Sequence, residues 1–238
     1  MLRKIIKAAR VCSKGVSRSA LLKHGVAAAI EHEEVIAAIA PTTLIDIGAN
    51  KGQFALATRT HCPRAMIHAF EPLPEAIETF ERVFRGDELT RLYPYALAAE
   101  EGQVDFHVGS RGDSSSLLPI GEGQKAAYSV TETEVISVEV RRLESLLDLE
   151  KLPRPLLMKI DVQGAELKVL EGIEDFSSID HIYVELSFVE LYTQQALFED
   201  VYDFLAKEGY RLRGIYNPSF TEEFGMTQVD ALFSRSPG

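Results

Sequence analysis

Short apolar segments that alternate with helical segments constrain the fold of this 238-residue chain more than any other feature. Residues 43–47 form an apolar, β-branched run that ends at Gly48, which is typical of a strand buried on both faces. A helical segment follows at 53–61, then a second apolar run at 65–70 and a second helix at 74–84. This order predicts a parallel sheet with right-handed crossovers, and therefore a doubly wound α/β fold.

The alternation is interrupted once and then resumes. A third strand is expected at 92–97, after which two alternating segments, 104–108 and 135–140, predict an inserted β-hairpin. The Gly- and Ser-rich residues 109–123 predict a mobile loop within this insertion. The remaining expected elements are a helix at 142–149, a strand at 156–160, a helix at 165–170, a strand at 182–186, a helix at 194–207 and strands at 210–215 and 229–234.

The first 40 residues predict an N-terminal helical extension, and the main domain is expected to span 41–238. A break is expected near Gly15, before a second helical segment at 27–40 that ends at Pro41. Residues 1–24 contain seven Lys and Arg residues and no acidic residue, with apolar residues at helical spacing (Leu2, Ile5, Ile6 and Ala9). This segment suits a helix that covers the core, but contact with an anionic membrane or a second copy in a homodimer stays open.

Charge and composition exclude several classes of function. The formal net charge of -11 argues against nucleic-acid binding, which needs clustered Lys and Arg to neutralise phosphates. No stretch approaches the ~18 apolar residues of a membrane span or forms a secretory apolar core, so a cytoplasmic location is expected. Cys12 and Cys62 are expected to be free thiols. The histidines lack metal-ligand spacing, so no dedicated metal site is expected.

Acidic residues occur where the predicted parallel strands end. They are Asp46, Glu71, Asp161 and Glu185. Ligands of open parallel sheets bind beyond these strand ends, so the acids are expected to share one rim. The loop at 48–52 lacks both the Gly-Lys-Ser/Thr phosphate cradle and the Gly-x-Gly-x-x-Gly dinucleotide turn. An acidic rim therefore suits a cation that carries a diol, such as S-adenosylmethionine, whose two ribose hydroxyls one carboxylate can bind.

The loop after the first strand is expected to make a tight turn. Gly48 lets the chain leave the strand, and Gly52 lets the next helix approach closely enough for its first amides to reach the ligand. Asn50 stands where many such loops have another glycine, and asparagine tolerates the left-handed conformation. Glu71 lies 23 residues after Gly48, close to the interval at which nucleotide-binding folds place their ribose carboxylate.

Four motifs together resemble the FkbM-type methyltransferases. They are Asp-Ile-Gly-Ala-Asn-Lys-Gly-Gln-Phe (46–54), Phe-Glu-Pro (70–72), Lys-Ile-Asp-Val-Gln-Gly-Ala-Glu (159–166) and Asp-Ala-Leu-Phe (230–233). The resemblance covers about residues 42–234. It implies a Rossmann-like class I methyltransferase sheet of seven strands with the last one antiparallel, S-adenosylmethionine as donor, and O-methylation of a hydroxyl on a sugar or polyketide-like acceptor. Gln163 departs from the family pattern, which usually has Glu there and so one more carboxylate.

The resemblance also implies a set of cofactor-binding residues. Those expected around the methionine and ribose are Asp46, Gly48, Asn50, Gly52, Phe54, Glu71 and Pro72, together with Asp161. Residues 95–97, including Ala96, are expected near the adenine, and residues 114–116, including Ser115, are expected to fold over the cofactor.

Methyl transfer is an in-line displacement, and an alcohol must lose a proton as it attacks. Asp161, Glu185 and His107 are the candidate bases. For Lys159, neutralisation of nearby acids is the favoured role, and Glu166 suits a helix start as well as a site. Other interpretations stay open: a nicotinamide-dependent oxidoreductase, a non-catalytic binding domain, or a divalent ion held by Asp161 and Glu185.

Overall fold

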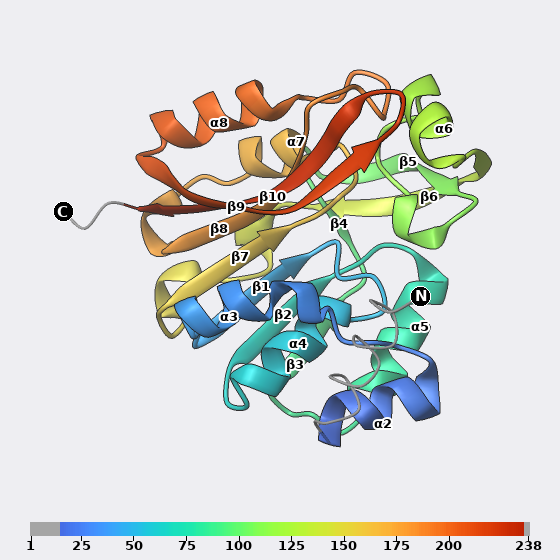
Figure 1. The fold of residues 1–238 in the computed structure, drawn as a ribbon. Helices are drawn as coiled ribbons and strands as arrows, with labels where there is room; N and C mark the ends of the chain where they lie inside the picture. Colours follow the sequence, from blue (N-terminus) through green and yellow to red (C-terminus); the bar gives the residue numbers. More distant parts are fainter. Residues whose placement is uncertain (1–14, 236–238) are drawn as a thin grey trace.

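A seven-stranded sheet forms the centre of the protein in the computed structural model, which describes residues 15–235 (Figure 1). The strand order is β3-β2-β1-β7-β8-β10-β9, and β10 runs antiparallel to both of its neighbours. The strands are β1 (Thr43–Ile47), β2 (Met66–Phe70), β3 (Thr90–Tyr93), β7 (Leu156–Ile160), β8 (His181–Ser187), β9 (Tyr210–Thr221) and β10 (Gly225–Arg235). This confirms the predicted doubly wound, mostly parallel sheet in which the last strand of the chain is antiparallel.

The central strands are apolar because both of their faces are covered. Every residue of β1 and of β7 is buried, and the two strands pair in register from Thr43↔Leu156 onward. Side chains alternate between the faces, so Ile45 and Ile47 point to one layer of helices and Leu44 points to the other. The run at 43–47 was therefore recognisable because parallel strands covered on both faces contain few polar residues.

Helices cover the two faces of the sheet as separate layers (Figure 1). The first layer contains α2 (Gly15–His24), the 3-10 turn η1 (Ile30–His32), α3 (Glu33–Ile39), α4 (Gln53–His61) and α5 (Pro74–Val83). The second contains α7 (Glu166–Glu171), the 3-10 turn η5 (Phe176–Ser178) and α8 (Phe198–Lys207). Both layers pack against β1 and β7, the central strands of the sheet. The loops that follow these two strands therefore lie at the middle of the edge formed by the carboxyl ends of the parallel strands.

The N-terminal extension belongs to the same core as the sheet. The break expected near Gly15 lies at the limit of the described residues, which begin with α2, and the chain turns after this helix at Gly25, which has a φ of +71°. The second helix starts at Glu33 after η1 and ends, as expected, immediately before Pro41. The basic amphipathic positions 2–9 lie outside the described residues. Within 15–235, no helix is long and apolar enough to cross a membrane.

The inserted hairpin is confirmed as a small second sheet with the order β4-β6-β5. Its strands are β4 (Ala96–Leu97), β5 (Gly102–Gly109) and β6 (Glu132–Arg141). The single strand expected at 92–97 is wrong: β3 pairs with β2, whereas β4 pairs with β6. Pro94 lies between the two strands and cannot donate to either ladder. The expected loop contains η2 (Gly112–Ser114) and α6 (Glu122–Tyr128) rather than irregular chain alone.

Other expected boundaries differ from the structure. The helix at 142–149 is wrong, because two 3-10 turns, η3 (Leu143–Ser145) and η4 (Leu149–Lys151), bury the leucines of this segment instead. Helix α8 begins at Phe198, since Gln194 has a left-handed φ of 62° and its backbone cannot continue a helix. The last two strands are longer than expected because β9 and β10 pair with each other as a hairpin.

Candidate active site

A cavity of about 510 Å³ opens where β1, β2 and β7 end, a volume in the range of small-molecule sites. Its walls come from three parts of the chain: the strand-end loops, the small sheet with η2, and the segment between α2 and α3. In a parallel sheet this edge is where the chain crosses from strand to helix, so polar backbone and side chains meet there. Of the four acids expected to share one rim, Glu71 and Asp161 line this cavity.

Glu71 follows β2 directly and lines the cavity, although its side chain is only 6% exposed. One carboxylate oxygen accepts the backbone N–H of Asn50 at 2.8 Å, and the other accepts that of Leu73 at 2.8 Å. Burial raises the pKa of Glu71 to about 7, against the lowering effect of these two amides. The carboxylate is thus fixed in place while retaining further acceptor positions.

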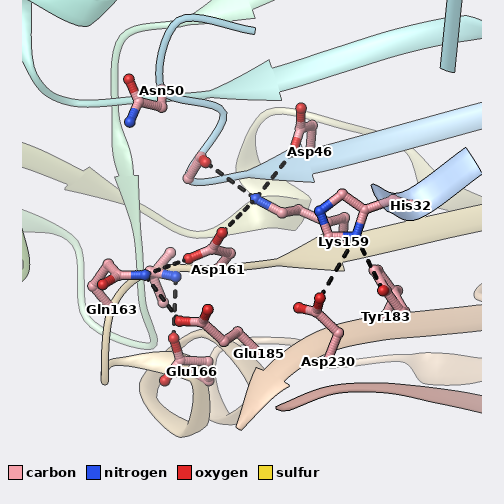
Figure 2. Close-up of polar contacts among 12 residues, drawn as sticks. His32, Asp46, Asn50, Lys159, Asp161, Gln163, Glu166, Tyr183, Glu185 and Asp230 are labelled. Atoms are coloured by element: carbon pink, nitrogen blue, oxygen red, sulfur yellow. Dashed lines mark hydrogen bonds and ion pairs between the residues drawn. The ribbon is translucent and has the colours of Figure 1, made fainter. Parts of the chain in front are cut away.

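Lys159 lies between two acids in the middle of the site (Figure 2). Its ammonium is 3.2 Å from the carboxylate of Asp161 and 3.7 Å from that of Asp46, and it donates to the carbonyl of Gly48 at 3.3 Å. Although burial opposes the charged form, Asp161 and Asp46 raise the pKa of Lys159. Asp46 is fully buried, and its burial raises the pKa of that carboxyl despite Lys159. The predicted neutralising role of Lys159 matches these contacts.

Gln163 connects Asp161 to Glu185 (Figure 2). Its amide nitrogen donates to Asp161 at 2.7 Å and to Glu185 at 2.9 Å, and Gln228 donates to the same Glu185 oxygen at 2.7 Å. Burial opposes ionisation, but Lys159 and this amide hold the pKa of Asp161 below its usual value. Burial, followed by the nearby Asp161, raises the pKa of Glu185 well above its usual range.

The Gln163 amide also fills the position where the alternative interpretation placed a divalent ion, between Asp161 and Glu185. Glu166 is turned the other way, with one oxygen accepting the backbone N–H groups of Val162 and Gly164 at 3.1 Å. It thereby closes the turn before α7, a structural role. Among the residues that the structure describes, no group of three or more acidic, His or Cys side chains could hold a metal ion.

The loop after β1 is folded against the end of β7. Gly48 has a φ of +77°, and a Cβ at this position would lie 1.9 Å from the carbonyl oxygen of Asp161. Asn50 is left-handed with a φ of 47°, which confirms the turn expected there. Gly52 is also left-handed, but the space beside it is filled by Phe84 and Phe80 rather than by the cavity. The first glycine shapes the site, and the second packs helix on helix.

Comparison with known proteins identifies the family of this domain. The family model described as the methyltransferase FkbM domain matches residues 46–212, from the acid of β1 to the start of β9. The chain belongs to the FkbM methyltransferase family. This family assigns the domain to the methyltransferases, not to the nicotinamide-dependent oxidoreductases considered from the sequence.

The chain is similar in sequence to several named methyltransferases. The chain is 31% identical over 170 residues to the 2-O-methyltransferase NoeI of Sinorhizobium fredii, covering 68% of this chain and 70% of that protein. It is 30% identical over 158 residues to Methyltransferase 1 of Beauveria bassiana, covering 60% and 64%. It is 26% identical over 148 residues to the hexuronic acid methyltransferase AglP of Haloferax volcanii, covering 60% and 55%. The chain thus spans between 55% and 70% of these relatives.

A solved structure of an FkbM methyltransferase from Methylobacillus flagellatus has a similar fold. The two structures superpose with a TM-score of 0.51 at 13% sequence identity, over 79% of this chain and 43% of the other. At this identity the likeness concerns the fold alone, and it agrees with the sheet described above.

Most of the cofactor residues expected from the sequence line the cavity of this FkbM domain. They are Gly48, Asn50, Phe54, Glu71, Pro72, Ala96, Ser115 and Asp161. The others lie elsewhere: Asp46 is beneath the floor beside Lys159, and Gly52 is in the helix interface. Glu185 is behind Gln163, and His107 is on β5, where its ring contacts Glu132 at 2.7 Å. Neither Glu185 nor His107 reaches the cavity wall.

Sequence reasoning missed the contribution of the N-terminal segment to the cavity. Val26, Ala29, Glu31 and His32 all line it, although the family match begins only at residue 46. Their signal in the sequence was weak, because nothing local indicates that a segment before the first strand folds back over the strand ends. The role of Gln163 was also missed, since its glutamine was considered only as a lost carboxylate.

Proposed function

We propose that the protein transfers the methyl group of S-adenosylmethionine to a hydroxyl of a sugar or a similar small acceptor. The observation that carries this proposal is the cavity at the ends of β1, β2 and β7, which has Glu71 on one wall and Asp161 on another. The family supplies the reaction class, and the cavity supplies the acidic, diol-binding chemistry that this donor requires.

The residues present fit the donor at both of its ends. Each Glu71 oxygen accepts one backbone N–H, so the carboxylate retains lone pairs for the two ribose hydroxyls. Asp161, held ionised by Lys159 and Gln163, supplies negative charge for the positively charged methionine end. Tyr95, Ala96 and Leu97 provide the more apolar wall that would hold an adenine ring. The donor itself supplies a methyl carbon already activated by its sulfonium.

The protein has to position the acceptor and exclude water rather than create a reactive group. Closely placed partners react with high effective molarity, so alignment of the acceptor oxygen with the methyl carbon contributes much of the rate. The loop after β1, η2 and the segment between α2 and α3 enclose the cavity from different sides. We expect this enclosure to orient the acceptor over Asp161 and Gly48.

The acceptor class is inferred from the relatives. NoeI is named a 2-O-methyltransferase, AglP a hexuronic acid methyltransferase, and a relative from Streptomyces tacrolimicus a 31-O-demethyl-FK506 methyltransferase. Two of these names refer to methylation at an oxygen, and one refers to a sugar acid. A polar cavity that includes Asp113, Ser115 and Gln163 suits such an acceptor, since these side chains can donate to or accept from several hydroxyls.

Calorimetry with S-adenosylhomocysteine tests the donor site. Wild-type protein is expected to bind it, and Glu71→Gln to bind it about 10- to 100-fold more weakly, because one or more charge-assisted hydrogen bonds are lost. Glu78→Gln is the matched control, since Glu78 is exposed on α5 outside the cavity. Equal affinity of wild type and Glu71→Gln, or no binding by wild type, would refute the site.

Transfer of labelled methyl groups tests the acceptor class. The probes are a panel of p-nitrophenyl glycosides, including a glucuronide, incubated with labelled S-adenosylmethionine. Methylation of at least one glycoside at a hydroxyl, located by mass spectrometry, supports the proposal. Binding of the donor without methyl transfer to any glycoside of the panel would overturn the sugar acceptor and leave the donor site intact.

A further inference from the structure

A group of polar side chains lies on the sheet face that α3 and α4 cover, and we name it the polar face: Asp46, Lys159, Tyr183, Glu185 and Asp230. The register explains why these residues gather. Asp46 lies opposite Lys159, Lys159 opposite Tyr183, and Glu185 opposite Asp230. Because alternate residues share a face, each strand contributes its polar side chains to the same side as Leu44 and Leu157.

His32 projects from the end of η1 onto this polar face (Figure 2). Its Nδ1 lies 3.1 Å from the hydroxyl of Tyr183, 3.2 Å from the amide nitrogen of Asn217 and 3.6 Å from a carboxylate oxygen of Asp230. Three groups from β8, β9 and β10 therefore surround one ring nitrogen. The same imidazole also lines the cavity, next to Phe54.

These contacts favour one tautomer of His32. The Tyr183 hydroxyl donates to the Asp230 carboxylate. Asn217 donates to Asp230 at 2.8 Å and to the Tyr183 hydroxyl at 3.4 Å, so both of its amide hydrogens have acceptors other than Nδ1. A tyrosine hydroxyl that donates to a carboxylate has its oxygen lone pairs left to accept, so it can receive a proton donated by Nδ1. The nearby carboxylate also stabilises a proton on Nδ1. Asp230, through Tyr183, thus sets Nε2 as the basic nitrogen.

Aromatic packing fixes the direction of the ring. The His32 ring centroid is 5.2 Å from that of Phe54 and 5.6 Å from that of Tyr183, in tilted and edge-on arrangements. Nδ1 is directed at β8 and β10, and the same ring lines the cavity, where His32 contributes to lowering the pKa of Asp161. The imidazole is held in orientation by packing as well as by hydrogen bonds.

The carboxylates considered from the sequence are less suited to accept a proton. Asp161 is stabilised in its ionised form by Lys159 at 3.2 Å and by Gln163 at 2.7 Å, which makes it a weak base. Glu185 lies behind Gln163 and does not line the cavity. His107 is directed at Glu132 on the small sheet. Of these side chains, only Asp161 meets the cavity at all.

We infer that His32 is the general base of the transfer, and that the acceptor hydroxyl binds between His32 and the loop after β1. This inference rests on the proposed function. An oxygen lone pair of the acceptor forms the bond to the methyl carbon, and the carbon–sulfur bond breaks with its electron pair remaining on sulfur as a neutral thioether. The hydroxyl proton passes to Nε2 of His32 and then to solvent. Asp230 is a positioning residue that stabilises the resulting imidazolium through Tyr183.

Substitution of His32 tests the base in turnover. His32→Asn is expected to lower kcat on the best glycoside by about 10²- to 10⁴-fold, the usual range for a general base, with much less change in the Kd of S-adenosylhomocysteine. His32→Gln provides a second variant if the first folds poorly. His61→Asn is the matched control, because His61 contacts Glu33 at 3.2 Å on α4 outside the cavity and should retain its kcat. A kcat for His32→Asn within threefold of wild type would overturn the assignment.

Imidazole NMR gives a readout that needs no acceptor and so separates this inference from the proposed function. The signals of His32 are identified by their loss in His32→Asn. We expect the neutral ring to carry its proton on Nδ1, and Asp230→Asn to shift the population toward the Nε2-protonated tautomer. Among the described residues, the titratable groups near the ring include Asp230, Tyr183 and Asp161, and the titration also reports on them. A wild-type ring protonated on Nε2 at neutral pH would overturn the inference even if methylation is observed.

Discussion

The close approach of Gly48 to the end of β7 gives a prediction that joins stability to the donor site. In Gly48→Ala, the new Cβ would lie 1.9 Å from the carbonyl oxygen of Asp161, whereas ordinary contact begins at 3.4 Å. One of the two backbones must therefore retreat by about 1.5 Å. Because the obstructing atom is backbone, no side-chain rotation can relieve the clash.

The expected loss has two parts. A non-glycine residue in the left-handed region costs about 1–2 kcal/mol, offset by about 0.4–1 kcal/mol from the reduced freedom of the unfolded chain. Overpacking adds about 1–3 kcal/mol. Gly86→Ala isolates the first part, because Gly86 has a similar φ of +83° and no atom within 4 Å of its added Cβ. Gly48→Ala should therefore be about 1–3 kcal/mol less stable than Gly86→Ala.

Urea denaturation of both variants measures this difference, which at about 2–4 °C per kcal/mol also predicts a Tm about 2–12 °C lower for Gly48→Ala. Calorimetry on the same samples should show weaker binding of S-adenosylhomocysteine only in Gly48→Ala, because the displaced loop changes the distance between Asp161 and Glu71. Two variants of equal stability and equal affinity would refute the idea that this glycine holds the strand ends together.

Three further measurements probe the buried charges. Affinity for S-adenosylhomocysteine should fall about tenfold from pH 8 to pH 6, because the pKa of Glu71 is raised to about 7 and only its ionised form accepts both ribose protons. A calorimetric affinity that does not change between these pH values contradicts this. Lys159→Met should lower the free energy of unfolding, measured by urea titration, by about 3–5 kcal/mol, because Asp46 and Asp161 lose their shared cation. The double variant with Asp46→Asn should recover part of this loss. The pKa of Glu185 is raised, so the folded protein binds this proton more tightly than the unfolded chain, and stability falls as the pH rises above the ordinary pKa of 4.5. The stability of Glu185→Gln should therefore increase relative to that of wild type between pH 5 and pH 8. A stability difference that does not change with pH would exclude this.

Local patterns were sufficient to predict the centre of the fold. The strands at 43–47 and 156–160 were recognised because a strand covered on both faces consists mostly of apolar residues. The carboxylate after β2 was recognised because polar residues at the ends of such strands have few structural reasons to be there. Asn50 was expected to be left-handed from residue type alone, and the structure has it so.

Elements that depend on distant partners were not predictable in this way. The segment at 92–97 has uniform strand propensity, and its division between two sheets is decided by β2 and β6, which lie far away in the sequence. The 3-10 turns around Leu143 and Leu149 likewise follow from the shape of the core that their leucines fill. Tertiary packing determined these boundaries, and no window of local sequence contains that information.

The position of His32 shows where the missing information was. The strands of the polar face carry polar residues among apolar ones, as in Leu-Ile-Asp-Ile at Asp46 and Tyr-Val-Glu-Leu at Glu185. These interruptions are visible in the sequence, but whether they share a face depends on strand order and register, since a shift of one residue would turn a side chain to the opposite layer. With the observed order β1-β7-β8-β10 and its register, these side chains face the helical layer that contains η1, α3 and α4. A histidine in that layer, such as His32, then becomes the expected partner for Asp230 rather than an isolated residue in an N-terminal extension.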